Sequence, residues 1–163
     1  MSRIVIRTRL SGVVLRQLVP ADAAHYFALA DRHRPHLSQH GDPTADKYPN
    51  EAAVLKSIVH PRNPKKLRFG IWDGFAFVGM VGLTPLGRGV CETGGWTGQE
   101  FCRLGYATAT RRALALYAMR AMGYRRVIAK THPDNSVSQG MLRKAGYRLV
   151  RRTKKSHYFV FEG

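Results

Sequence analysis

The fold is decided by the stretch GGWTGQEFCRLGYATATRRALALYAMRAMG, from Gly94 to Gly123. Its first part is polar and glycine-rich, which favours turns, and its second part is an alanine- and leucine-rich run that predicts a helix. Gly105 and Ala107 lie at the junction, where Glu100 is the nearest carboxylate. A helix start has unpaired N–H groups and a partial positive charge, so this one is suited to a pyrophosphate. If the junction is considered without its surroundings, the alternative is that Gly105 and Ala107 are small only because the helix start is closely packed.

The segments around this helix predict a sheet. Hydrophobic periodicity and turn residues indicate strands at 4–18, 66–86 (two, joined at Asp73-Gly74), 89–96, 125–133 and 147–162 (two), and helices at 21–33, 51–59 and 135–146. Residues 34–50 predict a loop rich in Pro, Gly and Asp. This order predicts an α/β fold around a mixed sheet, with one β-α-β unit at its centre.

Length and composition predict one soluble domain over residues 1–163. Apolar residues make up 44% of the chain, and no apolar run is long enough to span a bilayer. The first twelve residues interrupt their apolar positions with arginine, so we expect no secretory signal. Cys91 and Cys102 are the only cysteines, and free thiols in a cytoplasmic protein are the simplest interpretation.

The chain is strongly basic. It has 27 Lys and Arg against 10 Asp and Glu, a formal charge of +17. A field of this sign favours anionic partners such as a phosphorylated cofactor, a nucleotide or the ribosome, and disfavours polycationic substrates. An arginine-rich composition without specific meaning is the alternative, since the basic residues are spread along the chain. The segment RRTKKSH (151–157) predicts a charged turn rather than a nucleic-acid patch.

Four signatures occur in one order over about 60 residues. They are Glu92-Thr93-Gly94-Gly95-Trp96, Cys102–Ala107, Asn135–Ser138 and Lys144-Ala145-Gly146-Tyr147. Together they resemble the acetyl-CoA-binding core of the GNAT N-acetyltransferases, most closely the RimJ/RimL-like branch that acetylates N-terminal amines of ribosomal proteins. The resemblance implies a single-domain GNAT fold with a mixed, mostly antiparallel central sheet flanked by helices, and a central β-α-β unit that binds acetyl-CoA.

The resemblance also implies a set of cofactor-binding residues. They are Gly95, Trp96, Thr97, Arg103, Leu104, Gly105, Tyr106, Ala107, Thr108, Asn135, Ser138 and Lys144. A backbone N–H at Gly95 or Trp96 would polarise the thioester carbonyl. Asn135 would hold the pantetheine amides, or cap the following helix, or both. Arg103 would add a cation at the rim of the pyrophosphate turn, with Arg111 and Arg112 one or two turns further on.

The chain departs from the family pattern at three positions. Cys102 stands where Arg or Gln is usual, and Arg103 stands where Gly is usual, so we expect weaker or reoriented phosphate contacts. Leu142 stands where many members have a tyrosine that protonates the leaving thiolate. Ser138 is therefore the candidate partner of the leaving sulfur, with a helix-capping hydroxyl as its alternative role.

Amide formation requires an amine that has lost its proton, which a nearby carboxylate can accept. Of the four glutamates, Glu92 alone lies on the strand that the resemblance places beside the thioester, so Glu92 is the candidate general base. A structural carboxylate paired with an arginine is its alternative role. His33, His36 and His40 have a spacing suggestive of a metal face, but Pro35 interrupts the helix that they need, and we expect no metal site.

The function expected is an acetyl-CoA-dependent N-acetyltransferase. It would move the acetyl group to a primary amine, either a protein N-terminus or a small molecule, by direct attack on the thioester. The loop from His36 to Asn50 would line the acceptor side. The alternative is a catalytically weak GNAT-fold module that binds RNA or the ribosome through its basic surface. No membrane association is expected, and the protein would be a monomer or a homodimer.

Overall fold

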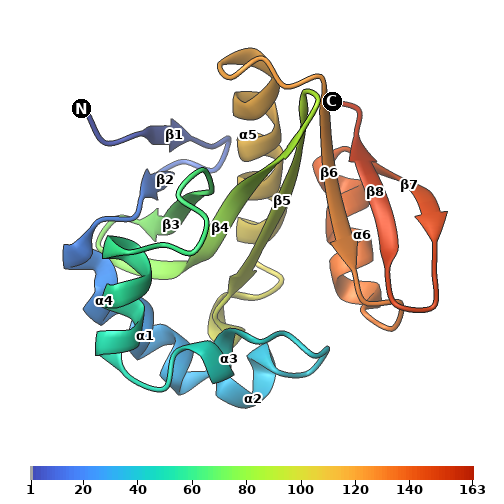
Figure 1. Ribbon diagram of the computed structural model, residues 1–163. Helices are drawn as coiled ribbons and strands as arrows, with labels where there is room; N and C mark the ends of the chain where they lie inside the picture. The colour runs from blue at the N-terminus through green and yellow to red at the C-terminus, as the bar shows by residue number, and fades with distance from the viewer. Residues whose placement is uncertain (1) are drawn as a thin grey trace.

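The computed structural model describes residues 2–163, which form one eight-stranded sheet in the order β1-β2-β3-β4-β5-β6-β8-β7 (Figure 1). The strands are β1 (Val5–Arg7), β2 (Val13–Gln17), β3 (Leu67–Asp73), β4 (Ala76–Gly87), β5 (Val90–Thr97), β6 (Arg126–Thr131), β7 (Tyr147–Arg152) and β8 (His157–Phe161). Neighbouring strands are antiparallel except β5 and β6, which are parallel. The predicted mixed, mostly antiparallel sheet is confirmed.

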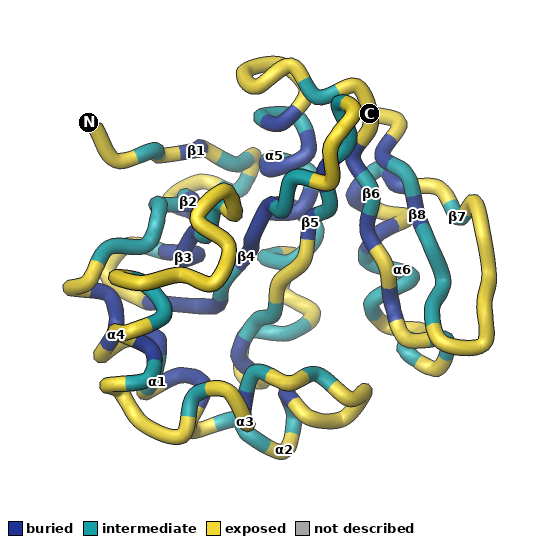
Figure 2. Tube along the Cα trace, in the orientation of Figure 1, coloured by how far each residue is buried: buried dark blue, intermediate teal, exposed yellow. Residues whose placement is uncertain are grey.

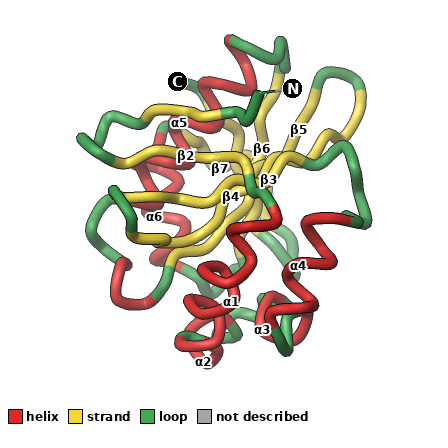
Figure 3. The backbone as a smooth tube through the Cα atoms, turned by 90° about the vertical axis from the view of Figure 1, so that its left-hand side faces the viewer, coloured by secondary structure: helices red, strands yellow, loops and turns green. Residues whose placement is uncertain are grey.

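Helices cover both faces of the sheet (Figures 1 and 3). The helices are α1 (Ala23–Arg32), α2 (Arg34–Leu37), α3 (Thr44–Lys47), α4 (Glu51–Val59), α5 (Tyr106–Arg120) and α6 (Ser136–Ala145), with short 3₁₀ turns η1 (Pro20–Asp22) and η2 (Gln99–Phe101). α5 and α6 pack together on one face, and α1 packs with α4 on the other. Among the described residues, none of these helices is both long and apolar enough to cross a membrane.

Two hydrophobic clusters reflect this arrangement. Side chains alternate between the two faces of a strand, so Ile71 packs in the cluster under α5 and α6 while Trp72 packs in the cluster under α1 and α4. Figure 2 shows long buried stretches in β3 and β4. This double coverage explains why the residues of β3 and β4 form nearly continuous apolar runs.

β5 and β6 pair over three residues only. Val90–Glu92 lie beside Arg126–Ile128, after which β5 continues against β4 to Thr97 and β6 continues against β8 to Thr131. The two strands diverge visibly toward their C-terminal ends (Figure 1). α5 and α6 start at this same end of the molecule, so the β5-α5-β6 unit brings two helix starts to the place where the sheet opens.

The predicted elements are present, with one difference. Residues 34–50 contain the short helices α2 and α3 rather than a plain loop. Pro35 is compatible with α2 because it lies in the first turn, where a backbone N–H has no intrahelical acceptor. The Asp42 carboxylate starts α3 by accepting the N–H of Thr44 at 2.7 Å. Local side-chain bonds of this kind have no hydrophobic period, so the sequence pattern missed both helices.

We predict that Gly79→Ala destabilises the protein by about 1–3 kcal/mol, the usual cost of forcing atoms into a packed site. A Cβ at Gly79 would lie against the carbonyl oxygen of Trp96 and 2.8 Å from Thr97 Cα, both backbone atoms of the neighbouring strand. Gly94→Ala is the matched control, because nothing lies within 4 Å of a Cβ there. Urea unfolding measures both, and equal stability of the two variants would contradict the close β4–β5 approach.

Candidate functional site

Glu92 is the last residue of β5 that pairs with β6, and it lies opposite Thr84 of β4. Its nearest cation is the exposed Lys130 on β6, whose Nζ is 4.0 Å from Glu92 Oε2. An exposed pair at that distance contributes little to stability. Within residues 2–163, no arginine forms an ion pair or hydrogen bond with Glu92. Glu92 therefore has no arginine in direct contact, although its charge acts on the buried Arg111 of α5.

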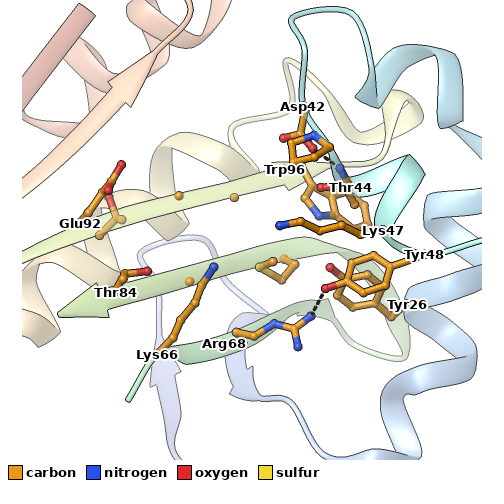
Figure 4. A pocket seen from close by; sticks show the side chains of 16 residues that line it. Tyr26, Asp42, Thr44, Lys47, Tyr48, Lys66, Arg68, Thr84, Glu92 and Trp96 are labelled. Atoms are coloured by element: carbon orange, nitrogen blue, oxygen red, sulfur yellow. Dashed lines mark hydrogen bonds between the residues drawn. The ribbon is translucent and has the colours of Figure 1, made fainter. Parts of the chain in front are cut away.

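Glu92 borders an open pocket of about 260 Å³ (Figure 4). The pocket lies between the surface of β4 and β5, the start of β3 and the α2–α3 region. Its lining residues are Tyr26, Asp42, Pro43, Thr44, Lys47, Tyr48, Lys66, Arg68, Met80, Gly82, Thr84, Glu92, Thr93, Gly94, Gly95 and Trp96. Residues from the segment 42–48, part of the expected acceptor loop, thus line the same pocket as the candidate base.

The backbone of Gly95 faces the opening between β5 and β6. The N–H of Gly98 donates to Val78 O at 3.0 Å, and hydrogen-bonded pairs alternate along an antiparallel ladder. That alternation directs the polar groups of Trp96 toward β4 and those of Gly95 away from it. A Cβ at Gly95 would meet the carbonyl oxygen of Met80, so only glycine fits there. Of the two candidate oxyanion donors, the geometry favours Gly95.

The side chain of Trp96 lies in the pocket rather than at the start of a helix (Figure 4). Its ring packs edge-on against Tyr26, with ring centroids 5.4 Å apart. Tyr26 is fully buried, and burial raises the pKa of its hydroxyl above the ordinary value. Trp96 therefore forms a wall of the pocket that Glu92 borders.

The turn before α5 adopts a left-handed backbone twice, at Arg103 (φ 64°) and Gly105 (φ 88°). The left-handed geometry at Arg103 explains why glycine is usual at this position. Among the described residues, no side chain caps the first turn of α5 and no acidic residue lies in it. The N–H groups of Tyr106, Ala107 and Thr108 are therefore available, and the exposed Arg103 and Leu104 flank them.

Side chains around this turn point away from the helix start. The Tyr106 hydroxyl donates to Asp73 Oδ2 at 2.6 Å, which ties α5 to the β3–β4 hairpin and raises the pKa of Tyr106. Cys102 Sγ lies 3.4 Å from His36 Nε2 and 3.4 Å from Thr97 Oγ1. Burial, with His33 and His40 nearby, lowers the pKa of His36. The turn can offer a ligand its backbone amides, while Cys102 and Thr97 contact each other.

At the start of α6, Asn135 acts as the helix cap. Its Oδ1 accepts the N–H of Ser138 at 3.1 Å, which leaves the side-chain amide nitrogen with no recorded partner among the described residues. The half-buried Ser138 hydroxyl likewise forms no hydrogen bond within residues 2–163. The capping role therefore belongs to Asn135, and the alternative role of Ser138 as a capping hydroxyl is not observed. Both residues keep a polar group for a ligand.

Lys144 lies at the other end of α6 from Asn135, roughly 15 Å away at 1.5 Å per helical residue. It is exposed in the last turn. Gly146 follows with φ 104° and closes the helix in the left-handed conformation, a common helix ending. The Lys-x-Gly signature therefore has a structural basis of its own. Leu142, where a tyrosine is usual in the family, is completely buried.

Arg111, one or two turns beyond the pyrophosphate turn, does not add to the exposed cations there. Arg111 is buried on the core side of α5, and its Nη1 has no hydrogen-bond partner among the described atoms. Burial lowers the pKa of Arg111, while the Tyr147 and Glu92 side chains act in the opposite direction. Its position follows from helical spacing, since Arg111 shares the buried face with Ala115 and Ala118.

Thr93, the residue after Glu92 on β5, forms a buried contact with Tyr147: its Oγ1 lies 2.9 Å from the Tyr147 hydroxyl. This bond links β7 to β5 across the β6–β8 ladder, at the point where β5 leaves β6. Neither residue was singled out from the sequence as part of a polar network. The only hint of this contact in the sequence was the tyrosine at the end of the Lys144–Tyr147 signature. Its partner Thr93 is 54 residues away, so no local pattern could reveal the pair.

The three histidines of the suggested metal face diverge. His33 lies 3.4 Å from Glu100, His36 contacts Cys102, and the ring of His40 lies 6.0 Å from that of His132. Within the part of the chain that the structure describes, no three His, Cys, Asp or Glu side chains form a group that could hold a metal ion.

Solved structures share this fold at low sequence identity. RimL, a ribosomal L7/L12 α-N-protein acetyltransferase in complex with coenzyme A, aligns with TM-score 0.82 and 16% identity over 96% of this chain and 97% of its own. Mycobacterium smegmatis RimJ aligns with TM-score 0.75 and 19% identity, over 98% and 86%. The microcin C7 self-immunity acetyltransferase MccE, in complex with acetyl-CoA and AMP, aligns with TM-score 0.74 and 16% identity, over 92% of each chain.

Curated protein sequences give no significant match. The family model of the acetyltransferase (GNAT) domain, in contrast, matches residues 13–148. This match spans most of the chain and includes β2 through the start of β7, so it contains the diverging strands, the turn before α5 and the start of α6. The chain belongs to the GNAT acetyltransferase family.

Proposed function

We propose that this acetyltransferase uses acetyl-CoA as its donor and transfers the acetyl group to a primary amine by direct attack on the thioester. The acceptor is a protein N-terminus or a small-molecule amine. One observation carries the proposal: β5 presents Glu92 to an open pocket and then continues through η2 and the turn at Arg103–Gly105 to the uncapped start of α5. An amine-binding side and an anion-binding side thus lie along a single strand.

The residues at the two helix starts fit acetyl-CoA. Acetyl-CoA supplies an acetyl group activated as a thioester. The N–H groups of Tyr106, Ala107 and Thr108, together with Arg103, would hold its pyrophosphate. The Asn135 side-chain amide, which capping leaves free, would bind the pantetheine. Lys144, at the far end of α6, contributes at most a distant positive charge in this arrangement.

Three groups divide the chemical work. Glu92 accepts the proton of the acceptor amine, directly or through a water molecule. The N–H of Gly95 stabilises negative charge on the carbonyl oxygen, since the ladder alternation directs it into the opening. The Ser138 hydroxyl hydrogen-bonds the sulfur as it leaves. None of these roles requires a covalent intermediate on Cys102, whose Sγ is turned toward His36.

The competing function is a module that binds RNA or the ribosome through its positive charge. The formal charge of +17 favours this alternative, and so does the substitution pattern at Cys102 and Leu142. Calorimetric titration with acetyl-CoA, followed by a turnover assay on amines, separates the two functions. Turnover supports the enzyme, whereas tight binding without turnover on any amine supports the module. In either case we propose a cytoplasmic protein, with Cys91 and Cys102 as free thiols, acting as a monomer or a homodimer.

We predict that Gly105→Val abolishes acetyl-CoA binding. The valine side chain would enter the space in front of the first helical turn, where the nearest described atom is Leu10 Cδ1, 3.8 Å from the added Cβ. It would also strain a backbone with φ 88°. Gly123→Val is the matched control, because Gly123 also has a positive φ (77°) but follows the other end of α5. Calorimetry with acetyl-CoA measures both affinities.

The control variant should lose stability but keep its affinity for acetyl-CoA. A folded Gly105→Val protein that binds acetyl-CoA as tightly as Gly123→Val would show that the pyrophosphate does not lie at this helix start.

We predict that Glu92→Gln lowers turnover by about 10²–10⁴-fold at neutral pH, the usual contribution of a general base. The loss should shrink as pH rises, because more of the acceptor amine then arrives without its proton. Acetyl-CoA affinity and unfolding free energy should change little, since the one ion pair that Glu92 forms among the described residues is with the exposed Lys130 at 4.0 Å. Steady-state kinetics from pH 6.5 to about 9.5 tests this, around the reference pKa of an α-amine.

Glu162→Gln is the control, because Glu162 is exposed and pairs with Arg148 away from the pocket. Near-normal turnover of Glu92→Gln at neutral pH would eliminate Glu92 as the base. A loss of turnover that is constant with pH and accompanied by lower stability would instead assign Glu92 a structural role.

A further inference from the structure

Three cationic side chains line the same pocket as Glu92. Lys47 comes from the end of α3, Lys66 from the residue before β3, and Arg68 from β3 itself. Figure 4 shows the amino groups of Lys47 and Lys66 directed into the pocket, with the Arg68 guanidinium beside the Tyr48 hydroxyl. Segments far apart in the sequence therefore bring positive charge to one side of the pocket, facing the strand that carries Glu92.

None of the three cations forms an ion pair with a carboxylate within residues 2–163. Arg68 is instead held by neutral groups: its guanidinium donates to Ser57 Oγ at 3.0 Å and to Tyr48 Oη at 3.2 Å. It also lies over the ring of Tyr26, 5.6 Å from the centroid. These contacts fix the orientation of Arg68 and leave its charge uncompensated.

Lys66 is held close to the surface of the sheet. A Cβ on Gly82 would lie 3.0 Å from Lys66 Cε and 3.8 Å from its Nζ, so the missing side chain of Gly82 makes room for the lysine. Partial burial lowers the pKa of Lys66, and the charges of Arg68 and Lys47 lower it further, while Tyr48 and Glu92 act in the opposite direction. Positive charges that crowd one another in this way gain from a bound anion, which relieves their mutual repulsion.

Neither of the two acidic groups of the pocket forms an ion pair with this cluster, although the charge of Glu92 acts on Lys66. Asp42 accepts the backbone N–H of Thr44 at 2.7 Å and starts α3, at the edge of the pocket near Trp96 (Figure 4). Glu92 lies on the opposite side, beside Thr84. The pocket is thus divided, with a carboxylate suited to an amine at one side and three cations at another.

We propose that the acceptor carries an anionic group, a carboxylate or a phosphate, in addition to its amine. The amine lies at Glu92, and the anionic group is bound by Lys47, Lys66 and Arg68. This inference rests on the proposed N-acetyltransferase function and narrows its substrate class. A pocket of about 260 Å³ that opens to solvent accommodates the reacting end of such a molecule and leaves the remainder outside.

Matched acceptors that differ only in the anionic group test the proposal. The dipeptide Ser-Asp-amide is compared with Ser-Asn-amide for a carboxylate, and O-phosphoserine amide with serine amide for a phosphate. We expect kcat/KM to be at least tenfold higher for the anionic member of one pair or both, in line with a hydrogen bond to a charged group. The pair with the larger ratio identifies the anion.

Lys66→Met and Lys47→Met should each bring that ratio close to one by slowing the anionic acceptor alone. Lys65→Met is the matched control, because Lys65 is the exposed neighbour of Lys66 and does not line the pocket. It should keep the wild-type ratio. Arg68 is not a suitable test position, since its loss would also release Ser57 and Tyr48.

Equal rates within both pairs, or unchanged ratios in Lys66→Met and Lys47→Met, would overturn the anionic acceptor while leaving the acetyltransferase function intact. Absence of transfer to every amine would contradict the proposed function instead. In that case, calorimetric titration of the wild type and Lys66→Met with O-phosphoserine and Ser-Asp-amide still decides the question. Binding weakened by the substitution supports the anion site, and no binding, or equal binding, refutes it.

Discussion

The separation of β5 from β6 after Glu92 is the constraint on which the rest of the structure depends. Two parallel neighbours in a buried sheet would normally pair along their length, because unpaired backbone groups are costly away from water. Here the pairing ends after three residues, and the backbone of Gly95 faces the opening. A ligand with its own amide groups can restore the missing bonds, which makes an interrupted ladder a binding feature.

Several contacts outside the opening fix the positions of β5 and of the start of α5. Gly79 and Gly95 let β4 and β5 approach so closely that a Cβ at either position would meet the backbone of the other strand. The Tyr147–Thr93 contact links β5 to the β7–β8 hairpin. The Tyr106–Asp73 hydrogen bond fixes the start of α5 against the β3–β4 turn. The position of the helix start relative to the strands is therefore determined by contacts on both sides.

The charges of the protein are organised at this site more clearly than its composition suggests. The formal +17 is spread along the sequence, yet the fold gathers Lys47, Lys66 and Arg68 on one side of the pocket and leaves Arg103 beside the turn. Glu92 faces these cations without a close partner. A positive field that draws anions in is compatible with the proposed role of Glu92 as proton acceptor, because the cations and this carboxylate occupy different parts of the pocket.

Much of this arrangement was predictable from the sequence. Hydrophobic periodicity located the strands and the long helices, and the resemblance to the GNAT family linked Glu92 on β5 with Gly105 and Asn135, which precede α5 and α6. Other features depend on tertiary contacts with no local pattern. The burial of Arg111 and the convergence of Lys66 with Lys47 were not foreseen, because only the fold buries Arg111 in the core and brings Lys66, 19 positions after Lys47, to the same pocket.

A crystal structure of the protein with coenzyme A bound tests the central claim most directly. The account predicts the pyrophosphate on the first-turn amides of α5, the pantetheine arm between β5 and β6 where the ladder is open, and the thiol on the side of β5 that carries Glu92. Coenzyme A bound outside the β5–β6 opening, or with its phosphates away from the residues that follow Gly105, would contradict the account.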